Sequence, residues 1–300
     1  MSRDYTSGFQ EYTFTTARKF LDYLNPLETD RWNPDIHIFR GQPDVNFNLV
    51  PSAHRLEGDI TASNFYGDHD INPDQQLTFE RTVLLAFLES CDKAGLQVPG
   101  DSVSVRRLLS QQTLAATRDW PPTEVYQVLA FAQHHGVPTC LLDWTRSPYV
   151  AAYFAASSAL SNLKEELEGY LAVWALSSRC REVEVIKTPG GVSPYLAAQS
   201  GLFTVSRITG SGTGNDVFMA STLDGSADRL TGPDAPFHLQ RLRLPKSEAP
   251  QLLSGCALLG VTGSVLFPGY EGIAKGVTDW ARVQHKHPGP VQDSLRSLLG

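Results

Sequence analysis

The chain has 300 residues, of which 41% are apolar and 19% are charged, so it is long enough to bury one large core or two smaller ones. Its formal net charge of −7 opposes broad, non-specific binding to a phosphate backbone. The four cysteines form no CxxC pair, which indicates reduced thiols and neither a disulfide framework nor a zinc site. The N-terminus has no apolar signal core, and no run of eighteen apolar residues occurs. We therefore expect a cytoplasmic protein without a membrane partner.

In chain order, the first half of the sequence predicts one helix, one strand and a helical block. Apolar spacing and turn residues place these elements, in order, at 17–24 (helix), 36–40 (strand), and 74–94, 101–117 and 123–131 (helices). The polar, turn-rich segment before the block is expected to be a loop. No linker sets the block apart, so we interpret residues 74–132 as a helical insertion within a single domain that spans residues 1–300.

The second half of the sequence predicts mostly strands. These elements follow in order at 140–145 (strand), 149–156 (helix), 170–176, 202–206 and 237–244 (strands, the last suited to a sheet edge), 249–259 (helix) and 264–267 (strand, then a turn and a helix start), with 182–186 as a further candidate strand. Residues 209–235 are expected to form a long loop or lid, and residues 284–300 a polar tail. Because strands and helices do not alternate regularly, we expect an α+β fold with a split, mostly antiparallel sheet.

An arginine, Arg40, ends the first predicted strand, where Gly41 and Gln42 follow it. One interpretation is a solvated strand end or a structural ion pair. The other is an anion-binding arginine aimed into a cleft, because a guanidinium group matches phosphate with two parallel hydrogen bonds. A second arginine, Arg55, follows after a turn.

The stretch 133–148 is the densest in polar and aromatic groups. Its neighbouring histidines, His134 and His135, diverge by about 100° if helical, so a structural role is favoured over joint metal ligation. Nothing in the sequence stabilises a thiolate at Cys140, which weakens a nucleophilic role. Trp144 suits a packing anchor better than a stacking platform. The chain also lacks HExxH, GxxxxGK[ST] and GxSxG motifs, and no metal site is predicted.

A family resemblance covers most of residues 35–280. Phe39-Arg40-Gly41, followed by QHHGVPTCLLDWTRSPYVAAYFA at 133–155, resembles the FRG domain, a bacterial family. Further matches lie at 49–55, 198–204 and 266–274. The resemblance implies a bacterial protein with a role as a toxin or an anti-phage defence effector.

A second resemblance is to ADP-ribosyltransferases with an Arg-Ser-Glu motif. Arg40 matches the arginine that grips the phosphates or ribose of NAD, and Asp143-Trp144-Thr145 align with the Ser-Thr-Ser strand that shapes the nicotinamide pocket. Glu271, on a predicted strand-turn, takes the place of the glutamate that bonds the nicotinamide ribose. Asp143 departs from the pattern, because a carboxylate stands where a hydroxyl is expected.

This resemblance implies an ADP-ribosyltransferase or NAD glycohydrolase, with NAD as a substrate and Glu271, Arg40 and Thr145 as catalytic residues. Glu271 would stabilise positive charge at the ribose C1, and Arg40 would position the pyrophosphate. Trp144 or Tyr270 would cover the ring. The residues expected to bind NAD are Arg40, Gly41, Gln42, Arg55, His134, His135, Asp143, Trp144, Thr145 and Tyr270.

The acceptor of the ADP-ribose group is left open between a protein, a nucleotide, a nucleic acid and water. Two other functions also stay open. The first alternative is a non-catalytic module that binds a nucleotide or nucleic acid through its arginines and Trp144. The second is a metal-dependent nuclease that uses Asp143, His134 and Glu271.

Overall fold

The computed structural model describes residues 2–6, 9–55, 58, 60–68, 70–110, 120–161, 167–179, 183–187, 194–207, 223–224 and 238–286. The lid predicted at 209–235 lies outside these residues except for 223–224. The predicted tail lies outside them from residue 287 onward, and its first three residues are helical.

The described residues form one eight-stranded sheet in the order β1-β2-β8-β5-β3-β4-β7-β6. All neighbouring strands run antiparallel except β2 and β8, which are parallel. The α+β class and the mostly antiparallel sheet are therefore confirmed. The strands are β1 (Ser2–Thr6), β2 (Phe9–Thr13), β3 (His37–Gln42), β4 (Leu141–Thr145), β5 (Tyr170–Ser177), β6 (Glu184–Ile186), β7 (Gly201–Val205) and β8 (Leu239–Pro245).

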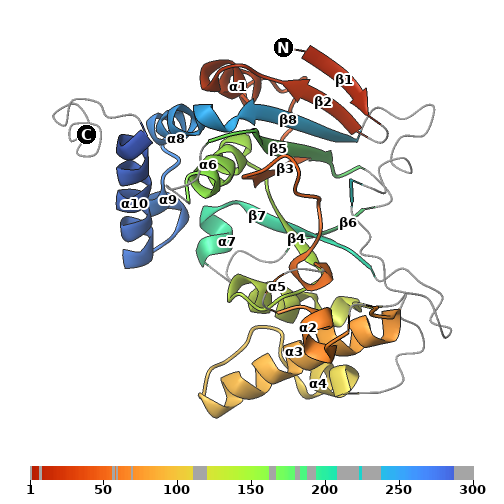
Figure 1. Ribbon diagram of the computed structural model, residues 1–300. Coiled ribbons are helices and arrows are strands. Elements are labelled where there is room, and N and C mark those ends of the chain that lie inside the picture. Colours follow the sequence, from red (N-terminus) through yellow and green to blue (C-terminus); the bar gives the residue numbers. More distant parts are fainter. Residues whose placement is uncertain are drawn as a thin grey trace.

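The helices fall into two groups (Figure 1). Helices α2 to α5 gather beside β4, β6 and β7, whereas α1, α6 and α8 pack together against the strands on the other side of β4. Every helix in the described ranges is too short or too polar to cross a membrane. The helices are α1 (Ala17–Tyr23), α2 (Ala62–Tyr66), α3 (Pro73–Lys93), α4 (Val103–Ser110), α5 (Tyr126–His134), α6 (Pro148–Ala159), α7 (Pro194–Ala198), α8 (Ala249–Leu258), α9 (Gly263–Leu266) and α10 (Tyr270–Lys286), with 3-10 turns at η1 (Ser52–His54), η3 (Thr123–Val125) and η6 (Lys246–Glu248).

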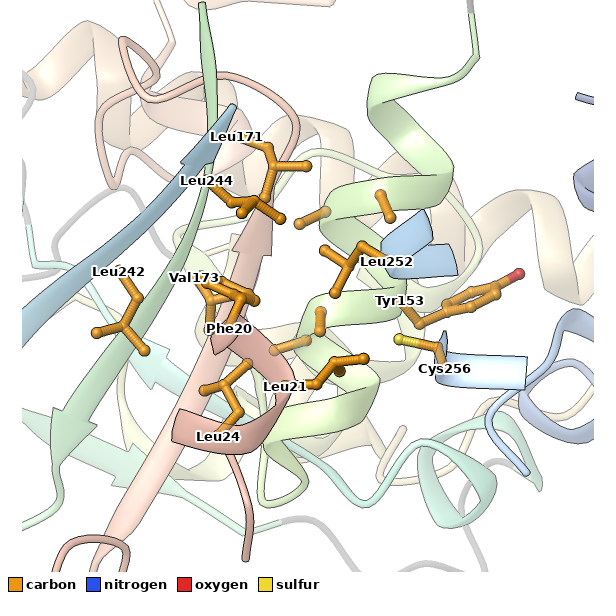
Figure 2. Packing of buried hydrophobic residues seen from close by; sticks show 14 of the residues in the cluster. Phe20, Leu21, Leu24, Tyr153, Leu171, Val173, Leu242, Leu244, Leu252 and Cys256 are labelled. Carbon is orange, nitrogen blue, oxygen red and sulfur yellow. The ribbon is translucent and has the colours of Figure 1, made fainter. Parts of the chain in front are cut away.

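Helix α6 is the centre of the main core. Ser147 caps it by accepting a hydrogen bond from the Val150 N–H, and Pro148 occupies its first turn, where a missing N–H costs nothing. Figure 2 shows side chains of β5 and β8, such as Val173 and Leu244, on one side of this helix and Leu252 of α8 on the other. Four alanines of α6, at 151, 152, 155 and 156, are fully buried, so the sheet and α8 approach its backbone closely.

Gly41 of β3 sets the closest approach in this core. A Cβ atom at this position would lie 2.0 Å from the carbonyl oxygen of Ala151 and 2.7 Å from the backbone nitrogen of Ala155. Only a residue without a side chain fits, because the obstructing atoms are helix backbone and not a movable side chain. The glycine of the Phe39-Arg40-Gly41 motif therefore allows α6 to lie directly against β3.

The strand pair β1–β2 was not predicted, and it changes the position of β8. The sequence Phe9-Gln10-Glu11 looks too polar for a buried strand, yet Glu11 is 4% exposed because Arg241 and Arg243 of β8 both form ion pairs with it. Cross-strand charge pairing removes the cost of burying the carboxylate. The prediction that residues 237–244 suit a sheet edge is wrong, since β8 lies between β2 and β5.

The strand predicted at 264–267 is also wrong. These residues form the short helix α9, with Leu266 buried and Val265 exposed. Gly263 packs against the backbone of Gly276 in α10, a contact that a side chain would block. A short apolar run that ends in a proline does not distinguish a buried strand from a helical turn, which is why periodicity alone misassigned it.

A fully buried polar cluster joins α3 to η1 and to Trp120. Glu80 of α3 accepts hydrogen bonds from Gln76 and Trp120, and its Oε1 atom lies 2.9 Å from Nε2 of His54. Burial alone would raise the pKa of Glu80, but the neighbouring His54 and the hydrogen bonds from Gln76 and Trp120 outweigh it and hold that pKa below its ordinary value. Glu80 is therefore ionised in the folded protein at neutral pH.

We predict that Gly41→Ala lowers the free energy of unfolding by about 3 kcal/mol or more, since the added methyl group meets helix backbone that has no room to shift. Chemical denaturation measures this change. Gly276→Ala in α10 is the matched control, because its Cβ would make only an ordinary contact at 3.6 Å. That control should be neutral or stabilise by up to about 1 kcal/mol. Equal effects of the two substitutions would contradict the proposed role of Gly41.

We also predict that Glu80→Gln lowers the free energy of unfolding by about 3 kcal/mol at neutral pH, because it removes one partner from a buried charged network. The folded pKa of Glu80 is depressed, so its contribution is present above the unfolded pKa and is lost as the pH falls through the folded value. The difference between wild type and variant should therefore shrink below about pH 4. Exposed Glu89 on the same helix provides the control, Glu89→Gln.

Candidate functional site

The candidate site lies where β3 and β4 separate. These two strands are joined by a single residue pair, Phe39 with Thr145. Beyond it, residues 40–42 pair only with β5, and residues 141–144 pair only with β7. The ladder between β3 and β4 therefore ends at this pair, and the two strands diverge beyond it.

Arg40 spans the gap. Its Nη1 atom donates a hydrogen bond of 2.8 Å to the carbonyl oxygen of Asp143, a backbone acceptor on the unpaired side of β4. The same Nη1 atom lies 3.6 Å from Oδ2 of Asp143. The guanidinium thus takes the place of a missing ladder hydrogen bond between β3 and β4.

Arg40 also has hydrogen-bonding capacity that its described contacts do not use. Its side chain is 16% exposed, and its buried Nε atom has no hydrogen-bond partner among the described residues. Burial lowers the pKa of Arg40, Asp143 opposes this, and nearby Arg55 lowers it further. An arginine remains protonated despite such a shift. The buried positive charge with a spare N–H is thus suited to an anionic ligand.

Asp143 is the acidic group of the cleft. Its side chain is 63% exposed, and its Oδ1 atom accepts a hydrogen bond of 2.7 Å from Gln133 of α5. Gln133 is fixed in turn by a short hydrogen bond from the Thr139 hydroxyl. This chain of contacts points the carboxylate into the gap from the side of the helical block.

Two hollows meet at the Arg40–Asp143 contact, and both residues line each of them. The first hollow has a volume of about 250 Å³ and extends between β4 and α6, where Phe154, Ser158 and Gln199 complete it. The second has a volume of about 220 Å³ and extends toward η1 and α5, with Ser52 and Arg55 in its wall. Exposed Arg55 adds a second positive charge to this second hollow.

Gln199 lines the first hollow and bonds to both Thr145 and Leu266. Its backbone carbonyl accepts a hydrogen bond of 2.7 Å from the Thr145 hydroxyl, and its side-chain amide donates to the carbonyl of Leu266 at 3.2 Å. The next residue, Ser200, has a φ of 49°, a left-handed conformation unusual for a residue other than glycine. Backbone strain of this kind often accompanies functional sites.

The two histidines have different surroundings. His134 is half-buried at the end of α5, and its ring lies 4.6 Å from that of Tyr195. Burial and then the neighbouring His135 lower the pKa of His134, with Asp143 opposing them. Exposed His135 packs instead beside Phe131, with ring centroids 4.6 Å apart. Neither histidine lines a hollow, although the charge of Asp143 acts on His134.

Several residues expected to bind NAD have structural partners instead. Trp144 lines the first hollow, but it is 3% exposed and donates its indole N–H to the Thr204 hydroxyl, so its side chain is a packing anchor. Gln42 is 5% exposed and bonds to Trp174 and the carbonyl of Asn48. Tyr270 is 95% exposed and lines neither hollow. Thr145 lines the first hollow, but its hydroxyl already bonds Gln199 and the Ser147 N–H.

Glu271 lies in the first turn of α10 and not on the predicted strand-turn. Its exposed carboxylate accepts a long hydrogen bond of 3.4 Å from the Tyr195 hydroxyl, and it lines neither hollow. Tyr195 in turn contacts the ring of His134.

Other chemistry receives little support at this site. Burial raises the pKa of Cys140 well above its ordinary value, and Glu80 raises it further, so the thiol stays protonated. Within the ranges that the structure describes, no group of three or more His, Cys, Asp or Glu side chains is arranged to hold a metal ion. The nuclease hypothesis therefore gains nothing from this part of the chain.

Sequence reasoning missed several residues that line the cleft, including Phe154, Ser158, Gln133 and Gln199. Phe154 and Ser158 belong to a helix whose apolar pattern suggested core packing alone. Gln133 and Gln199 lie inside the segments that resemble the FRG family, which was the available signal.

A comparison with protein-family models matches part of the chain. The family model described as the FRG domain matches residues 35–164. This range includes β3 with Arg40, the helical block, and β4 with Asp143. No curated protein and no solved structure matches the chain. The chain therefore carries an FRG domain, which spans residues 35–164.

Proposed function

We propose that the cleft binds NAD and that the protein cleaves the bond between nicotinamide and ribose, as an ADP-ribosyltransferase or an NAD glycohydrolase. The observation that carries this proposal is Arg40, a buried arginine with a spare N–H at the split of the sheet, with the Asp143 carboxylate beside it. Arg40 would bind the negatively charged pyrophosphate, and Asp143 would stabilise the positive charge that develops on the ribose.

Arg40 would hold the pyrophosphate. A guanidinium binds phosphate oxygens with paired, charge-assisted hydrogen bonds, and Arg55 in the wall of the second hollow would add a second cation. Fixing the pyrophosphate between the two hollows positions the nicotinamide ribose for reaction, a contribution that comes from orientation.

Asp143 would stabilise the transition state. As the bond from ribose C1 to the nicotinamide nitrogen breaks, its electron pair leaves with nicotinamide and positive charge develops on the ribose. A carboxylate in a partly enclosed cleft stabilises such charge. The acceptor, a hydroxyl group, an amine or water, then bonds to C1 and releases a proton to a base or to solvent. Asp143, which stands where the transferase pattern has a hydroxyl, would thus stabilise the transition state.

In this proposal Thr145 and Glu271, the other two residues that the transferase resemblance assigns to catalysis, act less directly. The Thr145 hydroxyl is occupied by Gln199 and Ser147, so it shapes the wall of the first hollow. Glu271 lines neither hollow, and its described contact is with Tyr195. The acceptor, a toxin or defence role and a cytoplasmic location remain predictions from the sequence.

A non-catalytic nucleotide-binding module is the second candidate. The placement of Glu271 outside the lining of both hollows favours it, because the transferase resemblance needs a glutamate at the reacting ribose. The two functions differ in one measurable respect. The module binds NAD without releasing nicotinamide, whereas the enzyme releases nicotinamide with each turnover.

We predict that Arg40→Lys lowers kcat/KM for nicotinamide release from NAD by about 100-fold or more, because a single ammonium group does not reproduce the two-point grip of a guanidinium. Labelled NAD with candidate acceptors, and with water alone, measures both transfer and hydrolysis. Arg18→Lys is the matched control, since Arg18 is 86% exposed on α1. Wild-type rates in the Arg40 variant would refute the proposed site.

A second prediction separates the two carboxylates. Asp143→Asn should reduce kcat by about 100-fold with little change in KM, because the charge acts mainly in the transition state. Glu271→Gln should have a smaller effect, since its described contact is with Tyr195. Asp35→Asn, at an exposed position before β3, is the control. The reverse order of effects would assign the catalytic charge to Glu271.

A further inference from the structure

A separate hollow with a volume of about 290 Å³ lies at the end of the sheet where β3 and β7 begin and where β4 and β6 finish. Ile38 in its wall belongs to the core on one face of β3, whereas the next residue, Phe39, packs in the core with α6 on the other face. The hollow therefore lies on the face of the sheet opposite α6. It shares no lining residue with the two hollows at the Arg40–Asp143 contact.

Strand register brings two cations to this hollow. Side chains alternate along β6, so Lys187, just after the strand, is on the same face as Val185. Continuing the register of β6 and β7 by one residue places Lys187 opposite Leu202, whose partner in β4 is Trp144. Arg146 follows Trp144 by two residues. Lys187 and Arg146 therefore flank Leu202 from the two strands beside β7, which are two strand spacings, about 10 Å, apart.

The described residues around the hollow do not neutralise these charges. No carboxylate is among its lining residues in the described part of the chain. Glu184, the acidic residue of β6, alternates to the other face and pairs with Arg207. Neither Arg146 nor Lys187 takes part in an ion pair within the described ranges. In a chain with a net charge of −7, two such cations at one hollow indicate a site for an anion.

A third cation adds to the positive potential at this end of the sheet. Exposed Arg179 follows Ser178, which lines the hollow. Burial lowers the pKa of His37, the first residue of β3; a backbone hydrogen bond with Asn33 opposes this, and the charge of Arg179 lowers the pKa further. The charge of Arg179 therefore acts at the start of β3, one residue from Ile38 in the wall of the hollow.

Arg146 is held in place with most of its donors unused. Its backbone N–H donates to the carbonyl of Ser200 at 3.1 Å, and its Nη1 atom donates to the carbonyl of Pro34 at 3.3 Å. A guanidinium has five N–H donors, and the described hydrogen bond of this side chain uses one of them. The half-buried group is thus oriented in advance and can still bind an oxyanion through paired N–H bonds.

The rest of the wall is mostly apolar. Four aliphatic residues at the edge of the core on this face complete it: Ile38, Val183, Val185 and Leu202. The volume of about 290 Å³ far exceeds the space that one water molecule needs. A hollow that combines cations with aliphatic side chains suits an anion that also carries an apolar group.

We propose that this hollow, which we call the basic hollow, binds a small phosphate monoester with an apolar organic group. Arg146 and Lys187 hold the phosphate, Arg146 through paired N–H donors, and the aliphatic side chains contact the organic group. The site goes beyond the proposed function, because it uses none of the residues assigned to NAD.

Isothermal titration calorimetry in a phosphate-free buffer at low salt tests the site with phenyl phosphate and inorganic phosphate. Phenyl phosphate should bind more tightly, since its ring contacts the aliphatic wall. Lys187→Gln should raise the Kd for phenyl phosphate by about 10-fold, as expected for loss of one charge-assisted hydrogen bond, and Arg146→Gln by at least as much. Lys187 is exposed, so its substitution tests the site even if half-buried Arg146 is needed for folding.

Lys19→Gln, at an exposed position of α1, is the matched control. It makes the same change in net charge away from the basic hollow, so its Kd should stay within about twofold of wild type.

Two further variants define the ligand and its location. Val185→Thr keeps the shape of the side chain but adds a hydroxyl group to the wall, so it should weaken phenyl phosphate binding by about 3-fold and leave inorganic phosphate unchanged. Arg40→Lys alters the other candidate anion site, and it should leave the Kd for phenyl phosphate as in wild type.

Four results would overturn the proposal. The first is wild-type protein that binds neither ligand, and the second is an unchanged Kd in both Lys187→Gln and Arg146→Gln. The third is an equal loss in Lys187→Gln and Lys19→Gln, which would show an effect of net charge without a site. The fourth is a loss in Arg40→Lys with none in Lys187→Gln, which would place the anion in the cleft. Phenyl phosphate that binds no more tightly than inorganic phosphate would overturn the assignment of a monoester.

Discussion

The hydrogen bond from Arg40 to the carbonyl of Asp143 is the interaction on which the candidate site depends. It bridges β3 and β4 at the point where their pairing stops after Phe39 and Thr145. A continuous ladder here would close the sheet and leave no cleft. An unbridged gap would leave a strand edge with unsatisfied backbone groups. One long side chain meets both requirements, because it satisfies the carbonyl and still leaves space and an N–H for a ligand.

Both the helical block and the sheet fix the positions of the charged side chains in the cleft. Gln133 of α5 holds the Asp143 side chain, while the buried Glu80 network fixes η1, next to Arg55. The charges of the cleft are thus set from one side by α3 and α5, and from the other by β3 and α6. Neither half contains the whole site, and the matched FRG segment, residues 35–164, carries Arg40, Arg55 and Asp143 from both halves.

Much of this arrangement was predictable from sequence, and the failures have physical causes. The strands that carry Arg40 and Asp143 follow local patterns of apolar residues, and so do the helices of the block. The β1–β2 pair depends on charge pairing between Glu11 and β8, a partner more than two hundred residues away, which no local pattern reveals. Phe154 and Gln199, which line the first hollow, were missed because side chains from separate elements meet there only in the folded chain.

The close contact between Gly41 and Ala151 gives the cleft two unlike walls. On the side of β3 and α6, backbone lies against backbone at Gly41, with no layer of side chains between the two elements, and Phe154 and Ser158 of α6 line the first hollow. The opposite wall, with Gln133 and Asp143, consists of side chains held by hydrogen bonds. Adjustment to ligands of different shape therefore falls to that wall, and the side of β3 and α6 acts as a fixed template.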